Sequence, residues 1–277
     1  MDLRFTTDPQ TFRTMSQEQL RKVFLLDSIF VPGSVQMVYS DIDRSITGSV
    51  IPLLQPLQLL SSKREMAADY FAERREIGIL NIGGDAFVKI EGVQYHLARK
   101  DGIYIGRGAK EIVFSSEKPD DPAAFYFVSY PAHSVYPVTM IKSADATPTR
   151  LGSRKDANER TIYKYIYPGS VKSCQLVMGM TELDEGSVWN TMPPHTHTRR
   201  SEIYMYFGLP PGAVVFHMMG QPGETRHIVM RDRQAVLSPS WSIHAGVGTS
   251  AYSFVWSMGG ENQAFDDMDG VNLTDVR

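Results

Sequence analysis

The stretch Asn190-Thr-Met-Pro-Pro-His195-Thr-His197-Thr-Arg-Arg-Ser-Glu202 gathers three potential metal ligands within eight residues. Side chains alternate between the two faces of a strand, so His195 and His197 are expected to point to the same side. After a bend over residues 198–201, Glu202 opens a second strand and brings a carboxylate back to the imidazoles. Two imidazoles and a carboxylate suit zinc, iron, manganese, nickel or copper, whereas oxygen ligands alone would favour magnesium or calcium. The stretch therefore predicts a metal site that still needs a fourth ligand.

The fourth ligand that we predict is His244, which follows a turn made of Ser238, Pro239 and Ser240. An isolated His-x-His pair is often only solvated or hydrogen-bonded, so the prediction depends on Glu202 and His244 standing at these spacings. His-x-His-x4-Glu, followed about 40 residues later by a histidine after a proline turn, resembles the metal signature of cupin barrels. The other histidines of the chain are less well placed: His96, His133, His217 and His227.

Composition limits the classes of function. The chain has 277 residues, of which 42% are hydrophobic and 21% charged, so it can build two ordinary packed domains. A net charge of −3 without a stripe of Lys and Arg argues against a nucleic-acid partner. The N-terminus lacks the apolar segment of a signal peptide, and no apolar run of about 18 residues predicts a membrane span. The single cysteine, Cys174, fits a reducing compartment, so we expect a cytoplasmic protein.

The pattern of apolar and turn-forming residues along the chain predicts an all-β fold with a few short helices. Ser16 and Gln19 form the pattern of a capping box, which predicts a short N-terminal helix. From Phe30 onward, short apolar runs alternate with Gly, Pro, Asp and Ser, as in a sandwich or barrel. The segment 142–159 is polar and interrupts this series of short apolar runs. We therefore expect a barrel with an N-terminal helix in residues 1–145, a linker in 146–159, and a second barrel in 160–277.

The two halves also repeat each other weakly. Arg74-Arg-Glu76-Ile-Gly-Ile-Leu-Asn-Ile-Gly83 parallels Arg199-Arg-Ser-Glu202-Ile-Tyr-Met-Tyr-Phe-Gly208, and Asp101–Gly108 corresponds to Gln234–Trp241. If Glu76 is aligned with Glu202, the two histidines fall on Asp69 and Phe71, so the first half has no comparable ligands. We expect a metal-free first barrel and a metal-binding second barrel. Two unrelated all-β domains are the alternative.

Longer motifs resemble the family of 5-keto-4-deoxyuronate isomerases of pectin breakdown, also called 4-deoxy-L-threo-5-hexosulose-uronate ketol-isomerases. They are Trp189–Pro193, Val215–Pro222, Glu224–Met230, Ser238–His244 and Phe265–Asp269. The resemblance implies two jelly-roll-like cupin barrels in one subunit, six subunits in the assembly, and one Zn²⁺ per subunit at His195, His197, Glu202 and His244. Against the general cupin pattern, Trp241 stands where a glycine is usual, and the gap between Gly186 and His195 is longer.

The resemblance also implies an intramolecular oxidoreductase of the aldose–ketose isomerase type. Its small-molecule substrate would be 5-dehydro-4-deoxy-D-glucuronate, and its product 3-deoxy-D-glycero-2,5-hexodiulosonate. Such a reaction needs a base to move a proton between adjacent carbons. Glu202 is one candidate base and His227 another, although a plain ligand and a hydrogen-bonded histidine are the alternatives. Arg226 is the first candidate to bind the substrate carboxylate, with Arg199 and Arg200 as further ones, and surface solvation is the alternative for each.

Two other functions fit the same scaffold. Three histidines and a glutamate can also hold iron, as in a dioxygenase. A sugar-binding or storage cupin without catalysis is the second alternative, although storage cupins generally lack the ligand set. Oxygen uptake and metal analysis distinguish these functions from an isomerase.

Overall fold

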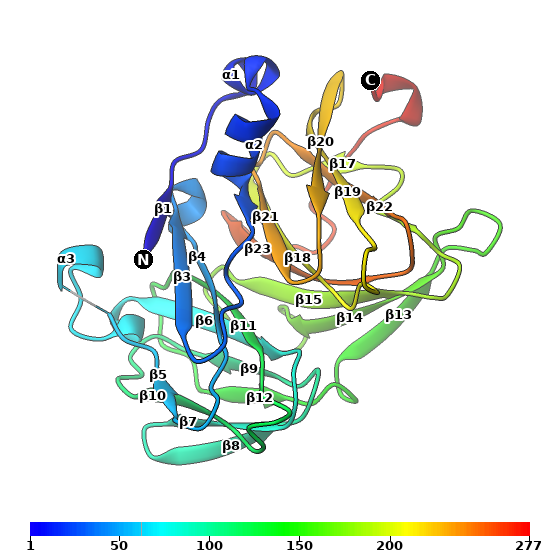
Figure 1. Ribbon diagram of the computed structural model, residues 1–277. Helices are drawn as coiled ribbons and strands as arrows, with labels where there is room; N and C mark the ends of the chain where they lie inside the picture. Colours follow the sequence, from blue (N-terminus) through cyan, green and yellow to red (C-terminus); the bar gives the residue numbers. More distant parts are fainter. Residues whose placement is uncertain (62) are drawn as a thin grey trace.

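The computed structural model describes residues 1–61 and 63–277. The chain is all-β, and each half contains one seven-stranded and one four-stranded sheet (Figure 1). The helices are short: α1 (Pro9–Thr14), α2 (Gln17–Phe24), α3 (Lys63–Met66) and the 3-10 turns η1 (Ile42–Arg44), η2 (Phe71–Glu73) and η3 (Leu273–Asp275). The predicted fold class, two jelly-roll-like barrels with few short helices, is confirmed.

The sheets of the first half occupy the left and lower parts of Figure 1. Its seven-stranded sheet has the order β1 (Asp2–Arg4), β3 (Val35–Ser40), β4 (Ile46–Val50), β11 (Phe125–Pro131), β6 (Arg75–Asn81), β9 (Gly102–Ile105), β12 (Thr139–Ile141). Its four-stranded sheet has the order β5 (Leu57–Gln58), β10 (Ile112–Ser116), β7 (Ala86–Ile90), β8 (Val93–Leu97).

The second half repeats this arrangement. Its large sheet has the order β13 (Thr147–Leu151), β14 (Arg160–Ile166), β15 (Val177–Leu183), β23 (Ser253–Gly260), β18 (Arg200–Phe207), β21 (Gln234–Ser238), β2 (Leu25–Leu26). Its small sheet has the order β16 (Trp189–Asn190), β22 (Ile243–Gly248), β19 (Val215–Gln221), β20 (Glu224–Met230). A separate ribbon pairs β17 (His195–Thr196) with β24 (Asp269–Gly270).

The register of the repeat differs by one residue from the alignment of Glu76 with Glu202. Ile77 pairs with Ile105 between β6 and β9, and Glu202 pairs with Ser238 between β18 and β21. Because Ile105 and Ser238 correspond in the two later segments, Ile77 is the counterpart of Glu202. A slip of one residue moves a side chain to the other face of a sheet, so the alignment through Glu76 is wrong. The alignment of the two arginine pairs gives the correct register.

Glu76 instead joins the two halves. Its buried carboxylate accepts hydrogen bonds from the backbone N–H groups of Cys174 at 2.6 Å, Gln175 at 2.8 Å and Leu176 at 2.9 Å. The hydroxyl of Tyr104 donates a fourth at 2.8 Å. One carboxylate of the first half thus satisfies three consecutive backbone donors of the second.

Two segments lie outside the boundaries expected from the sequence. Strand β2, from the first 145 residues, pairs with β21 of the second half, and α2 packs against β20 and β21. The capping box of Ser16 and Gln19 is present at the start of α2. In the segment expected to be a linker, residues 147–151 form β13, which pairs with β14 along five residues. The second barrel is therefore completed by the N-terminal segment and by part of that linker.

Two hydrophobic clusters hold the halves. One fills the first barrel, where Phe71, Phe114, Phe125 and Phe127 are almost fully buried. The other lies in the second half and extends to the interface between the large sheets. Gly78 allows the close approach there, since a Cβ atom on it would lie 2.7 Å from a methyl group of Leu176. The interior of the first barrel is thus filled by aromatic rings.

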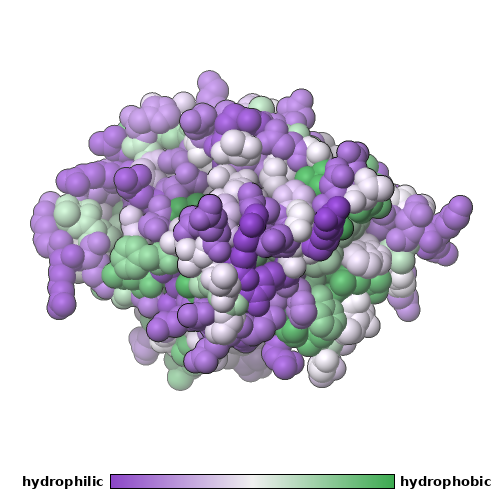
Figure 2. All heavy atoms as spheres, turned by 90° about the horizontal axis from the view of Figure 1, so that it is seen from above, coloured by the Kyte–Doolittle hydropathy of each residue, from purple (hydrophilic) through white to green (hydrophobic). Residues whose placement is uncertain are grey.

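The surface is mixed in character. Seen from above, hydrophilic residues predominate and hydrophobic residues form separate patches (Figure 2). No helix within residues 1–61 and 63–277 has the length and apolar character that a membrane crossing requires.

Candidate metal centre

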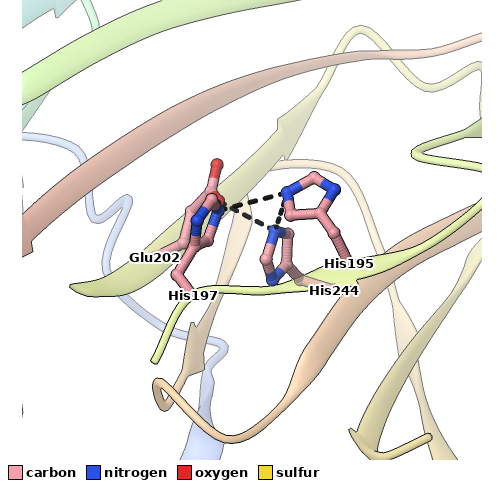
Figure 3. A group of neighbouring side chains, drawn as sticks. All are labelled: His195, His197, Glu202 and His244. Carbon is pink, nitrogen blue, oxygen red and sulfur yellow. Dashed lines mark hydrogen bonds and ion pairs between the residues drawn. The ribbon is translucent and has the colours of Figure 1, made fainter. Parts of the chain in front are cut away.

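The four residues predicted as ligands converge on one point. The Nε2 atom of His195 lies 3.1 Å from Nε2 of His197 and 3.0 Å from Nε2 of His244. The Oε2 atom of Glu202 lies 3.0 Å from Nε2 of His197 and 2.9 Å from Nε2 of His244. Figure 3 shows the three rings and the carboxylate pointing toward one another. Each residue therefore offers one donor atom to a shared centre.

Four separate segments bring these donors together. His195 lies on β17, His197 precedes β18, Glu202 lies on β18 and His244 on β22. β18 belongs to the large sheet and β22 to the small one, so the centre lies between the two sheets of the second barrel. The burial is deep, since His197 is 3%, Glu202 5% and His244 1% exposed. Unpaired polar groups at such depth would be costly, which favours a bound cation as their partner.

The charge state of the centre suits a cation. Burial and, to a smaller extent, the nearby His244 lower the pKa of His195 to about 3, so the ring of His195 is neutral at pH 7. Burial raises the pKa of Glu202, but His244 and His197 outweigh that effect and hold the pKa below its usual range. His195 therefore offers a neutral imidazole nitrogen and Glu202 an ionised carboxylate, the forms that bind metals.

The C-terminal segment orients His197. The Nδ1–H group of His197 donates to the backbone carbonyl of Asp267 at 2.7 Å, which leaves Nε2 as the lone-pair donor toward the centre. Arg200 is 1% exposed and donates to the same carbonyl at 2.8 Å. The side chain of Arg199 pairs with the carboxylate of Asp267 at 2.9 Å. Arg199 and Arg200 thus hold the C-terminal segment at Asp267, and the backbone carbonyl of Asp267 orients His197.

A cavity of about 240 Å³ opens onto the centre. Its walls are mainly apolar and include Phe254, Trp256, Met258 and Phe265. Three donors, His195, His197 and Glu202, also line it. A small organic ligand in this cavity can therefore reach the metal ligands while most of its surface is shielded from water.

The donor set fits a transition metal. Three nitrogens and one oxygen at mutual distances near 3 Å match the spacing of ligands around an ion with bonds of about 2.0–2.2 Å. Three imidazoles suit zinc, iron, copper or nickel better than calcium or magnesium. A second group, Asp85, His96 and Glu117, lies on the surface of the first half, where about half of each side chain is exposed to solvent, so it lacks this enclosure.

Two predicted catalytic residues lie elsewhere. His227 is exposed on the outer face of β20, where its ring lies 5.6 Å from the ring of Phe216. Arg226 donates from Nη1 to the backbone carbonyls of Phe12 and Met15 and so holds the end of α1. Neither residue lines the cavity. We therefore do not propose His227 as the base or Arg226 as the carboxylate ligand, because both stand on β20, an edge strand covered by the N-terminal helices and outside the cavity.

We expect His227→Gln to leave kcat/KM for the isomerisation expected from the sequence within about twofold of the wild type, since exposed substitutions away from a site change little. Steady-state kinetics with measurement of bound metal checks this. A fall of tenfold or more with full metal content would return His227 to the catalytic site.

The remaining candidates divide between core and cavity. Met258 lines the cavity, whereas the ring of Trp241 packs against Phe12 at 5.2 Å. Arg199 and Arg200 are engaged by the C-terminal segment, so they are not placed to receive a carboxylate in the cavity.

Two residues of the cavity, Tyr204 and Arg160, were not predicted from the sequence. Tyr204 is buried on β18, and its hydroxyl lies 3.1 Å from the hydroxyl of Thr191. Burial raises the pKa of Tyr204 well above its usual value, so the phenol keeps its proton. Arg160, the first residue of β14, also lines the cavity. Strand parity and depth of burial, which depend on tertiary pairing, were needed to find them.

Known proteins resemble this chain over most or all of its length. A family model described as the KduI/IolB family matches residues 31–273. The chain belongs to this family. Its similarity to the 4-deoxy-L-threo-5-hexosulose-uronate ketol-isomerase of Lachnoclostridium phytofermentans is 53% identity over the full length of both chains. The proteins of the same name from Caldicellulosiruptor bescii and Salmonella typhimurium are 50% and 48% identical, again over the full length.

Membership of the KduI/IolB family confirms the resemblance found in the sequence. It also confirms that the chain is an enzyme of the isomerase class, an intramolecular oxidoreductase, since these relatives are named as ketol-isomerases.

Solved structures support the fold. An IolB-like protein from Salmonella typhimurium superimposes with a TM-score of 0.70 at 14% identity, covering 87% of this chain and 94% of that one. A vicilin from Solanum melongena gives 0.59 at 11% identity over 91% and 86%. At these identities the likeness concerns the fold of two cupin barrels.

Proposed function

We propose that this member of the KduI/IolB family is a zinc-dependent ketol-isomerase of uronate catabolism. The substrate is 5-dehydro-4-deoxy-D-glucuronate, and the product is 3-deoxy-D-glycero-2,5-hexodiulosonate. The observation that carries the proposal is the convergence of His195, His197, Glu202 and His244 at the end of an apolar cavity. The names of relatives that are about 50% identical over the whole chain support the substrate.

The residues of the chain divide the chemistry between them. His195, His197, Glu202 and His244 would hold the Zn²⁺, which supplies Lewis acidity toward the carbonyl oxygen of the substrate. The apolar walls exclude water and so strengthen electrostatic interactions inside the cavity. Tyr204 remains protonated and can donate a hydrogen bond to a substrate oxygen.

Proton transfer is assigned to Glu202. Among the residues that the structure describes along the cavity, Glu202 is the one carboxylate. Its Oε2 atom faces His197 and His244, while its second oxygen has no hydrogen bond in the described ranges. In this scheme Glu202 takes the proton from C2 and returns it to C1, while the hydroxyl proton passes from O2 to O1. The aldose becomes a ketose with no external oxidant or reductant.

A coupled assay tests the function. Protein is measured with 5-dehydro-4-deoxy-D-glucuronate as prepared, after removal of metal by a chelator, and after zinc is restored. We expect conversion to the diketo acid that is lost on chelation, recovers with zinc, and consumes no oxygen. Oxygen uptake would favour the dioxygenase alternative, and absence of turnover despite bound zinc would leave a binding protein.

The proposal also includes a cytoplasmic homo-hexamer without nucleic-acid partners. The single cysteine supports the compartment. Exposed apolar side chains such as Leu54, Phe5 and Val135, at 78%, 67% and 72% exposure, support contacts between subunits. Light scattering of the purified protein measures the assembly.

A further inference from the structure

Arg160 brings a positive charge into the cavity that holds the metal ligands. It is the first residue of β14 and lines the same cavity as His195, His197 and Glu202. Within the described part of the chain, no other arginine and no lysine lines this cavity. A fixed cation in an apolar cavity selects for an anionic ligand.

The guanidinium of Arg160 is incompletely satisfied. Its Nη1 atom donates to the backbone carbonyl of Asn158 at 2.9 Å. Its Nε atom is buried and has no hydrogen-bond partner. Within residues 1–61 and 63–277, no carboxylate lies within 4.0 Å of the guanidinium. Burial lowers the pKa of Arg160, as expected for a cation without a counter-charge. An incoming carboxylate would supply the missing acceptor.

Tyr204 lines the same cavity as Arg160 and packs against a ring of the metal centre. The ring of Tyr204 lies 5.5 Å from the ring of His244, and its hydroxyl bonds to Thr191. Arg160, Tyr204 and Glu202 all line the same cavity. Arg160 forms no hydrogen bond with the four donors in the described chain, so the cavity has a metal-binding part and a separate cationic part.

From this arrangement we propose that Arg160 binds the carboxylate of the substrate while its aldehyde end lies at the metal donors. This assignment rests on the proposed function and gives it a specificity residue. A bidentate pair of guanidinium and carboxylate is directional, so it also fixes which end of a six-carbon chain reaches Glu202. A neutral sugar would leave the guanidinium unpaired and so bind weakly.

Replacement of Arg160 tests the assignment. In zinc-loaded Arg160→Met, we expect kcat/KM for 5-dehydro-4-deoxy-D-glucuronate to fall on the order of 10- to 100-fold, mainly through KM, because a contact present throughout the reaction is lost. Zinc content and the thermal midpoint should match the wild type. Arg160→Lys keeps the charge and should recover part of the loss. The matched control is Arg154→Met, whose side chain is 89% exposed, and it should retain the wild-type KM.

A binding measurement separates recognition from turnover. Calorimetric titration of each zinc-loaded protein with the product should show a loss of affinity for Arg160→Met of the same order as the change in KM. Unchanged KM and affinity in both Arg160 variants would overturn the assignment while leaving the isomerase function intact. Loss of zinc or of thermal stability in Arg160→Met would make the role structural and also overturn it. If the wild type neither converts the substrate nor binds the product, the proposed function itself fails.

Discussion

Replacing His244 with alanine is expected to abolish zinc binding and to lower kcat/KM by at least about a thousandfold. Loss of a residue that only orients a metal ligand typically costs less, about 10- to 100-fold. His244 is 1% exposed, and its Nε2 atom contacts both His195 and Glu202. Without this ring the donor set has three members and Glu202 loses one of its two imidazole partners. Metal analysis of the purified variant and steady-state kinetics measure both effects.

The control for this variant is His96→Ala. His96 lies in the first half, with 43% of its side chain exposed, beside Asp85 and Glu117. We expect this variant to keep its zinc and its activity. Circular dichroism should show native β structure in both variants, because the first barrel contributes none of the four donors. Full activity in His244→Ala would remove the assignment of the centre.

The ligands could be predicted because three of them stand close together in the sequence. His195, His197 and Glu202 occur within eight residues, and His244 follows a recognisable turn. Their convergence then requires only strand alternation and a barrel. The carbonyl of Asp267 could not be found in this way, because every residue carries a backbone carbonyl and none is marked by its side chain.

The face on which His227 lies could not be read from its neighbours. Residues Ile228, Val229 and Met230 are apolar without alternation, so the pattern around His227 does not say which side chains point inward. The pairing of His227 with Met218 on β19 decides it.

Strands β2 and β13 lie outside the expected boundaries of the second barrel for related reasons. Strand β2 has two residues, too few to produce a periodic pattern. Strand β13 is polar, mostly exposed and contains Pro148, as suits the edge of a sheet. In both cases the evidence for a strand comes from its partner strand and is absent from the segment itself.

The alignment of the two halves also could not be fixed to the residue from the sequence alone. Matching two glutamates by type aligned Glu76 with Glu202, although the arginine pairs beside them required a shift of one residue. That shift decides whether the carboxylate faces a barrel interior or the other half of the protein. Glu202 therefore lies among the four candidate metal donors, and Glu76 connects the two barrels.

Glu76→Ala is accordingly expected to lower the free energy of unfolding by about 3–5 kcal/mol, the effect of removing a buried charged partner. The change removes the acceptor of three backbone N–H groups, of Cys174, Gln175 and Leu176, and leaves them buried or half-buried without a partner. A fall of the thermal midpoint on the order of 10 °C follows for a chain of this size. Differential scanning calorimetry and chemical denaturation measure the change.

Two variants complete this test. Glu76→Gln keeps one carbonyl oxygen as an acceptor and nearly the same shape, so its loss of stability should be smaller than that of Glu76→Ala. Glu185→Ala, at an exposed glutamate of the second half, should stay within about 0.5 kcal/mol of the wild type. Equal stability of Glu76→Ala and Glu185→Ala would contradict the role of Glu76. If the role is correct, residues 174–176, which lead into β15, depend on a side chain of the first barrel for their hydrogen bonds. The first half would then stabilise the sheet on which Glu202 stands.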